Sequence, residues 1–240
     1  AALDRQIATW EAMVPVLAEN SDPNLVRLIW YGLQPCVTAY PGEAGRLAVA
    51  ARPRLLRQFI ARRLAEDMSS NPAAGAALFA SLGQSTEPVL LLDLLAGANR
   101  GLAGLSAVAA PEGATARLRE LMGSSFPTVR HAATLLAATL GGSSAIVALR
   151  RDLSDSAVPE DTRRAALERL AALRPAGLID DLLALLRSGQ LLDAALRALP
   201  AFDDPRVAKA IIAVFPSLPR ALHGTAIEAL VSRADSARAL

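Results

Sequence analysis

A short pattern recurs along this chain at intervals close to 31 residues. In five of the seven occurrences an aliphatic or Ala residue follows a polar or Arg residue by three positions, and in all of them a Leu follows three or four positions later. The central residues of the seven occurrences are Ile29, Ile60, Leu102, Ala133, Ala166, Ala195 and Ala226. The intervals between them are 31, 42, 31, 33, 29 and 31 residues. A nearly constant period of this length is typical of stacked supersecondary units, each of which buries its apolar face against its neighbours.

Each unit is predicted to be a pair of antiparallel helices. Hydrophobic residues make up 52% of the chain and aromatic residues only 4%, so the core must consist of Ala, Leu, Ile and Val, and strand formers are scarce. Prolines stand where many helices should begin: Pro23, Pro53, Pro127, Pro159, Pro205 and Pro219. We therefore expect an all-α fold, a right-handed α-solenoid that forms a single repeat domain over residues 1–240.

The one long interval, of 42 residues, predicts an insertion at about residues 68–99. This stretch begins with Ser69-Ser70-Asn71-Pro72 and leads into a helix around residues 88–95. We expect an extra helix or an extended loop here. Insertions in helical arrays often lie on a functional face, but they are also tolerated on the rest of the surface, and both interpretations stay open.

A polar ladder is the strongest regularity among the charged residues. It consists of the residues three positions before the central one: Arg57, Arg130, Arg163 and His223. In stacked helix pairs these positions recur one above another, so each can reach a turn carbonyl or an acidic residue of a neighbouring unit. Examples of such acidic residues are Asp22, Asp155, Asp161 and Asp203. The alternative is a basic concave strip that receives an acidic peptide or another domain.

A candidate interaction surface lies near the beginning of the chain. Trp30 and Tyr31 are adjacent on one predicted helix and point about 100° apart, so that one can be core while the other lines a groove. The densest basic cluster follows on the next patterned helix. The predicted interaction surface consists of Trp30, Tyr31, Arg57, Arg62 and Arg63.

The residues needed for catalysis or for a cofactor do not form a recognisable pattern. Cys36 is the only cysteine, and His131 and His223 are three repeats apart, too far for one metal ion. The sequence contains neither a Gly-rich phosphate loop nor a nucleophile elbow. We therefore predict that this segment is not an enzyme and has no catalytic, metal-binding or cofactor-binding residues.

The net charge and the hydropathy of the chain indicate which kinds of partner to expect. The net charge of +2 is too small to indicate nucleic-acid binding. A long uncharged run, residues 132–149, is divided by Gly141-Gly142-Ser143-Ser144, which predicts two short helices instead of a membrane span. The expected partner is a protein, either a neighbouring domain of the same polypeptide or a peptide.

The combination of Val-Arg-x-x-Ala-Ala helices with Leu-rich partners resembles HEAT repeats in a short version. Residues 22–35 (DPNLVRLIWYGLQP) and 56–65 (LRQFIARRLA) are similar to the helical-repeat region of large exported proteins of planctomycetes. Those proteins resemble membrane-bound dehydrogenases, in which a β-propeller comes first, then HEAT repeats, then a c-type cytochrome. The resemblance is most specific over residues 22–66 and only HEAT-like from about residue 126 onward.

The resemblance implies that this chain is the scaffold between two redox domains of a larger, exported or periplasmic protein. It departs from the whole-family pattern because it contains no propeller and no Cys-x-x-Cys-His motif, so haem c would belong elsewhere in the parent protein. Two alternatives remain. One is an enzyme of the helical-repeat DNA glycosylase type, which needs a basic face with aromatic residues. The other is a free-standing adaptor that binds a partner's peptide.

Overall fold

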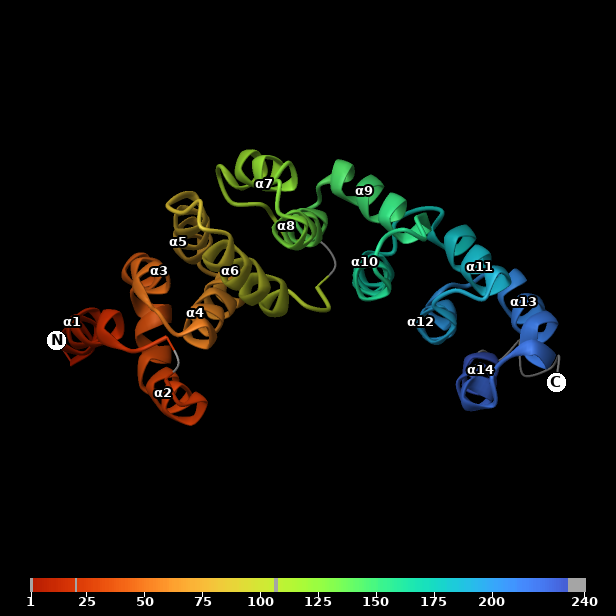
Figure 1. Ribbon diagram of the computed structural model, residues 1–240, viewed down its shortest axis with the longest axis horizontal. Helices are drawn as coiled ribbons and strands as arrows, with labels where there is room; N and C mark the ends of the chain where they lie inside the picture. The colour runs from red at the N-terminus through yellow and green to blue at the C-terminus, as the bar shows by residue number, and fades with distance from the viewer. Residues whose placement is uncertain (1, 20, 106–107, 233–240) are drawn as a thin grey trace. The chain divides into compact units, whose positions relative to one another are not determined.

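The computed structural model describes residues 2–19, 21–105 and 108–232, and the regular structure in these ranges is entirely helical (Figure 1). The predicted all-α class is therefore confirmed. The chain divides into two compact units, Ala1–Ala145 and Ile146–Leu240, and each is described by itself. The single repeat domain over residues 1–240 stays a prediction.

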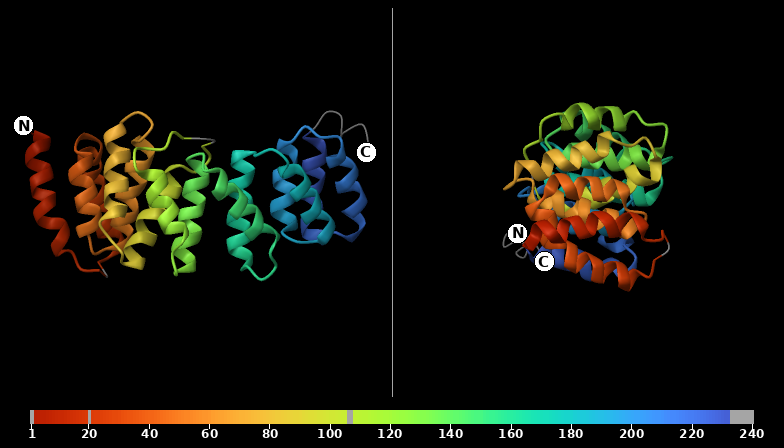
Figure 2. Two further views of the ribbon diagram at one scale, coloured as in Figure 1. Left: turned by 90° about the horizontal axis from the view of Figure 1, so that it is seen from above. Right: turned by 90° about the vertical axis from the view of Figure 1, so that its left-hand side faces the viewer.

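The first unit is built from four successive helix pairs. In chain order its elements are α1 (Ala2–Met13), the 3₁₀ helix η1 (Val14–Val16), α2 (Pro23–Ala39), α3 (Pro41–Ala50), α4 (Arg54–Asp67), α5 (Pro72–Gly83), α6 (Pro88–Gly101), α7 (Ala114–Met122) and α8 (Pro127–Thr139). The first helices of the pairs pack in the order α1, α3, α5, α7. The second helices pack in the order α2, α4, α6, α8. The unit thus has two layers of helices (Figure 1), and the left view of Figure 2 shows the successive helices standing in a row.

The second unit repeats this plan with shorter helices. Its elements are α9 (Ser143–Ser154), which begins at the end of the first unit, α10 (Glu160–Leu173), α11 (Leu178–Ser188), α12 (Leu192–Ala198), η2 (Leu199–Ala201), α13 (Arg206–Val214), η3 (Phe215–Ser217), η4 (Arg220–Leu222) and α14 (His223–Val231). α11 packs on α13, and α12 packs on both α10 and α14. A repeat-like two-layer arrangement therefore holds within this unit as well.

Proline and polar caps explain where the helices begin. Pro23 and Pro127 are the first residues of α2 and α8, and Pro53, Pro159 and Pro205 directly precede α4, α10 and α13. The missing N–H of proline costs nothing in the first turn, where backbone donors lack helical partners. Pro219 precedes the short η4 instead of α14 itself. The predicted proline signals are otherwise confirmed.

Side-chain caps complete several of these starts. The Asp22 carboxylate accepts a hydrogen bond from the backbone N–H of Asn24 at 2.8 Å, which makes Asp22 the N-cap of α2. Glu87 does the same for α6 by accepting from Val89 and Leu90. Such caps stabilise a helix by about 1 kcal/mol each.

The central residues of the seven repeats lie in the core. All are at most 8% exposed: Ile29, Ile60, Leu102, Ala133, Ala166, Ala195 and Ala226. The structure corrects the third of them. Leu102 is the residue after the end of α6, whereas Leu94 follows the first residue of α6 by six positions, as Ile29 and Ala133 follow theirs. Leu94 is fully buried and is the true counterpart.

This shift moves the extra residues to another part of the chain. Residues 68–99, predicted as an insertion, contain α5 and most of α6, which pack on α3 and α4 like the other pairs. The long connection instead runs over residues 102–113, between α6 and α7, and residues 106–107 of it lie outside the described part. Small residues at 72–83 hid the helical character of α5.

Candidate functional site

The helices α4 and α6 approach each other closely at two glycines of α6. A Cβ atom added at Gly97 would lie 2.4 Å from the carbonyl oxygen of Gln58, and one at Gly101 would lie 2.4 Å from that of Arg62. These two glycines therefore let the backbones touch. Asp93 lies one turn before Gly97, so the row 93, 97, 101 faces α4 along its length.

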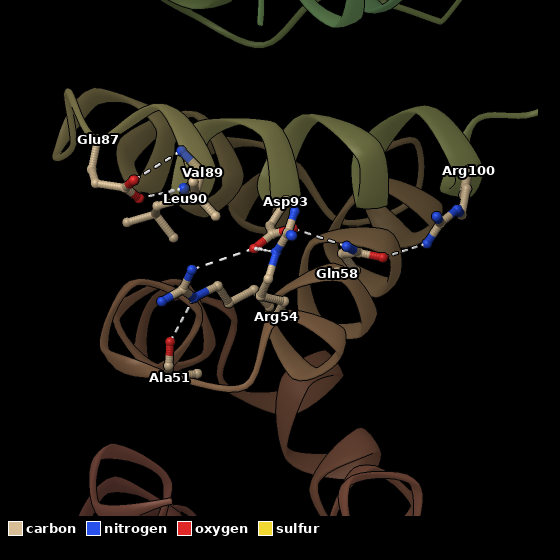
Figure 3. Close-up of polar contacts among 9 residues, drawn as sticks. Ala51, Arg54, Gln58, Glu87, Val89, Leu90, Asp93 and Arg100 are labelled. Carbon is tan, nitrogen blue, oxygen red and sulfur yellow. Dashed lines mark hydrogen bonds and ion pairs between the residues drawn. The ribbon is translucent and has the colours of Figure 1, made fainter. Parts of the chain in front are cut away.

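Asp93 is the centre of a polar cluster between α4 and α6 (Figure 3). Its side chain has no exposed surface. The carboxylate accepts hydrogen bonds from Arg54 at 3.0–3.2 Å, from Arg57 Nη1 at 3.3 Å and from Gln58 Nε2 at 2.9 Å. All three donors lie on α4. Gln58 in turn accepts a bond of 2.6 Å from Arg100. A buried carboxylate with several charged donors is satisfied, and it fixes one helix on the other.

The electrostatics of the Asp93 cluster follow from this geometry. Hydrogen bonding to Asp93, together with its negative charge, raises the pKa of Arg54 above the ordinary arginine value. Arg54 is half exposed, whereas the Arg57 side chain is only 15% exposed. Arg57 is therefore the donor that depends most on Asp93, because water cannot easily replace the carboxylate there.

The four residues of the predicted polar ladder all contact backbone carbonyls of the turn or helix end before their own helix. Arg57 Nε donates to Ala51 O at 2.6 Å, and Arg130 Nη1 donates to Ser124 O at 2.8 Å. Arg163 Nε donates to Leu153 O at 3.1 Å, and a ring nitrogen of His223 lies 3.1 Å from Leu218 O. These carbonyls follow or end the first helix of the same pair, not of the neighbouring one. In these four pairs the ladder position thus joins the two helices.

The five residues of the predicted interaction surface divide among three environments. Trp30 packs on Phe59 with ring centroids 5.5 Å apart. These two rings line a groove of about 210 Å³ between α2 and α4, together with Arg62 and Arg63. We call it the Trp30 groove. Tyr31 is 68% exposed and lies outside this groove, and Arg57 belongs to the Asp93 cluster.

The arginines of the Trp30 groove are held by acidic neighbours on α4. Arg62 Nε contacts Glu66 at 2.7 Å, and Arg63 Nε contacts Asp67 at 3.1 Å. Asp67 also accepts a hydrogen bond from Thr38 at 2.9 Å, which connects α4 to α2. Both guanidinium groups are therefore held by carboxylates, with the Arg62 side chain about half exposed and the Arg63 side chain 29% exposed.

A second cavity lies in the second unit, among α9, α10 and α11. It has a volume of about 270 Å³ and is lined by Arg150, Arg163, Asp181 and Gln190 together with small and apolar side chains. We call it the Arg163 pocket. Arg163 is 7% exposed and also donates to the amide oxygen of Gln190. Arg150 Nε lies 3.1 Å from Asp181 Oδ2, and its Nη2 donates to Ala176 O at 2.6 Å.

The Arg150–Asp181 contact is an ion pair of poor geometry. The two facing atoms are buried, yet neither has a partner that meets hydrogen-bond geometry, although they are 3.1 Å apart. Burial raises the pKa of Asp181 above the usual aspartate value; Arg150 opposes this shift, and the adjacent Asp180 adds to it. Burial of the carboxylate therefore outweighs the attraction to Arg150, although about a third of each side chain is exposed.

Reasoning from the sequence missed Asp93, the glycine row and the Arg163 pocket. Asp93 could have been noticed, since it is the one charged residue within the apolar run of residues 88–98. If an acidic residue in such a run is buried, it needs hydrogen-bond donors from a neighbouring helix. Two of the acidic residues named as examples of ladder partners are used differently: Asp22 caps α2, and Asp155 accepts a hydrogen bond from the backbone N–H of Ala157.

Within the described ranges, no three His, Cys, Asp or Glu side chains gather in a way that could hold a metal ion. In the same ranges, none of the helices has the length and apolar character needed to cross a membrane. Cys36 is buried, and burial raises the pKa of its thiol. No protein-family model matches the chain, and searches of curated proteins and of solved structures likewise found no match.

Proposed function

We propose that this chain is a non-catalytic helical-repeat scaffold, in which HEAT-like helix pairs form a right-handed α-solenoid. One observation carries the proposal: the strongest polar constellation, around Asp93, is used entirely to fasten α6 to α4. The four ladder residues are likewise used to join the two helices of their own pairs. The recurrence of these bonds and the two layers of each unit support an array of repeats.

We further propose that the scaffold binds a protein at the Trp30 groove and the adjacent exposed residues of α2. Trp30 offers an aromatic wall, Arg62 and Arg63 offer oriented charges, and Tyr31 extends the surface with an exposed ring. Aromatic and Arg side chains contribute most of the binding energy in protein interfaces. Arg57 is not part of this surface, since its guanidinium is occupied by Asp93 and Ala51.

The resemblance of residues 22–66 carries a more specific proposal about the parent protein. In that proposal the scaffold connects a propeller dehydrogenase-like domain to a c-type cytochrome domain in an exported redox protein. The partner of the Trp30 groove would then be a neighbouring domain of the same polypeptide. The similarity of the Asp22–Pro35 and Leu56–Ala65 segments is what supports it.

Site-specific photo-crosslinking tests the interaction surface. A photoreactive phenylalanine analogue replaces Tyr31 in the source organism, and the same analogue replaces Val147 as a control, since both residues are 68% exposed. We expect a defined protein crosslink from position 31 that is lost when Trp30→Ala is added, and none from position 147. Equal products from both positions, or a product that persists with Trp30→Ala, would contradict the proposal.

Isolation of the native polypeptide tests the parent protein. An antibody against this chain should detect, in the periplasmic or exported fraction, a protein much larger than 25.1 kDa that stains for covalently bound haem. Detection of a haem-free polypeptide would refute the redox context. It would leave the scaffold proposal to be judged by the crosslinking result.

A further inference from the structure

Arg163 is a buried cation whose partners are neutral. Its side chain is 7% exposed, and its guanidinium donates to the carbonyl of Leu153 and to the amide oxygen of Gln190. Among the described residues, no carboxylate pairs with it. A buried guanidinium normally has a counter-charge, because burial removes the water that would otherwise solvate it.

The first unit shows how the same ladder position is satisfied when an acid is present. Arg57 occupies the position of Arg163 and also donates to a carbonyl at the end of the preceding helix. Its second partner is the carboxylate of Asp93, 3.3 Å away and fully buried. In the second unit Gln190 takes the place of that acid, and beside it lies the Arg163 pocket of about 270 Å³.

The other charges of the pocket leave a positive excess. Arg150 and Arg163 face the cavity with one carboxylate, that of Asp181, which is already 3.1 Å from Arg150. The cavity is somewhat smaller than the roughly 300–1,000 Å³ of pockets that hold drug-sized molecules. Its size therefore suits one small acidic group or one side chain.

We propose that the Arg163 pocket binds a carboxylate supplied from outside the chain, which takes the role that Asp93 has beside Arg57. The geometry allows the carboxylate to accept charge-assisted hydrogen bonds from Arg163 while Arg150 supplies the second positive charge. The carboxylate is either an acidic side chain of a peptide or a free small acid. The peptide source rests on the proposed interaction function, whereas the free acid does not.

The test is a nuclear magnetic resonance titration of the full chain. The reporter is the Nε–Hε signal of Arg163, assigned by its loss in Arg163→Met. One arm uses succinate, and the other uses a short Ala/Gly peptide with blocked ends and one central Glu, with the Gln version of the same peptide as a control. We expect the Arg163 signal to shift with the Glu peptide or with succinate, and not with the Gln peptide.

Variants locate the binding. Arg163→Met should weaken binding about tenfold to a hundredfold, because charge-assisted bonds are lost, with backbone signals in α9–α11 as the readout. Arg187→Met is the matched control: Arg187 lies on α11, is exposed and donates to Leu183, outside the pocket. It should leave the affinity unchanged.

Gln190→Glu keeps the proposal falsifiable even if Arg163→Met folds poorly. The new carboxylate would sit where the Gln190 amide oxygen contacts Arg163 and would provide the missing counter-charge internally. We expect this variant to melt at a higher temperature than the parent chain. Its affinity for the probes should fall by about tenfold or more. Unchanged melting together with unchanged binding would overturn the proposal.

The two arms separate the outcomes. Binding of the Glu peptide alone supports a peptide carboxylate as the ligand. Binding of succinate alone supports the pocket as a site for a free acid and counts against its use in peptide recognition, while the Trp30 groove stays a separate question. No shift of the Arg163 signal with either probe, at concentrations well above about 1 mM, overturns the inference.

Discussion

Arg57 and Arg163 occupy the same position in two repeats of one chain, and their surroundings differ in one respect. Both donate to a carbonyl at the end of the preceding helix. Arg57 also meets the buried carboxylate of Asp93 from the next helix pair, whereas Arg163 meets the amide of Gln190. In the first unit the packing of α4 on α6 is closed, and in the second a cavity lies beside the arginine. One acid therefore distinguishes a site used to fasten helices from a site open to a ligand.

The largest effect expected from this comparison belongs to Asp93→Asn. The substitution keeps the shape but removes the buried negative charge, so that Arg54 and Arg57 lose their counter-charge. We expect the first unit to lose about 3 kcal/mol of unfolding free energy. Both tryptophans lie in this unit, so the urea midpoint of Trp fluorescence measures it. The exposed Glu112→Gln is the control, and an equal shift in both variants would remove Asp93 from its central role.

Gly97→Ala tests the closed packing of α4 on α6 without changing any charge. The added methyl group meets the Gln58 carbonyl at 2.4 Å and Ala61 at 2.8 Å, so the helices must separate. We expect a loss of about 2 to 3 kcal/mol, measured by the same fluorescence transition. Gly83→Ala, where nothing lies within 4 Å, should cost little. If both variants behave alike, the close approach is not what fastens α6.

Ala166→Leu applies the same kind of test to the second unit. Ala166 is fully buried at the centre of α10, and a larger side chain there overpacks the helix interface. We expect a loss of about 2 kcal/mol, read from the circular dichroism transition. An unchanged urea midpoint with an unchanged denaturant dependence would show that the second unit packs too loosely for the repeat centre to matter.

Exchanging the two ladder arginines for Met compares the units directly. Arg57→Met leaves the buried carboxylate of Asp93 short of a donor, whereas Arg163→Met leaves only neutral oxygens without one. We expect a loss of about 2 kcal/mol for Arg57→Met and about 1 kcal/mol for Arg163→Met. Urea titrations of both variants measure the difference. A larger loss for Arg163→Met would mean that its charge is already compensated.

The smallest effect concerns Asp181 and depends on pH. Its pKa is raised above 3.8, chiefly by burial, so the folded state holds the proton more tightly than the unfolded chain. The stability contributed in this way is fully present below pH 3.8 and is lost as the pH rises through the raised pKa. Asp181→Asn avoids that loss. The difference in melting temperature between Asp181→Asn and the parent chain should therefore increase from acid to neutral pH. The exposed Glu168→Gln is the control for this comparison.

Local signals in the sequence predicted much of the fold. Proline at a helix start and an aliphatic centre at a fixed distance from it are properties of one segment, so Pro23 with Ile29, or Pro127 with Ala133, could be found without knowing any neighbour. The same pattern gave the wrong residue at α6. Leu102 has the predicted spacing, but Leu94 is the buried central residue of this helix. A pattern of small and aliphatic residues is too permissive to fix its own register.

The site could be predicted only in part, because its contacts cross between repeats. The sequence identified Arg57 and Arg163 as members of one register, and Trp30, Arg62 and Arg63 as neighbours. It could not pair Arg57 with Asp93, 36 residues away, since that requires knowing how far α6 is shifted along α4. Nor could it indicate the Arg163 pocket, which depends on the turn that brings Gln190 to Arg163.

The contact of bare backbone at Gly97 and Gly101 has a consequence for how the first unit opens. Where two helices touch through their main chains, water reaches the amide groups only after the helices have separated. Amide hydrogens in the middle of α4 and α6 should consequently exchange with solvent the most slowly in the first unit, and together. Those of α1, at the end of the layers, should exchange independently and earlier. The glycine row thereby sets the boundary of the cooperative segment around which the remaining helices of this unit fluctuate.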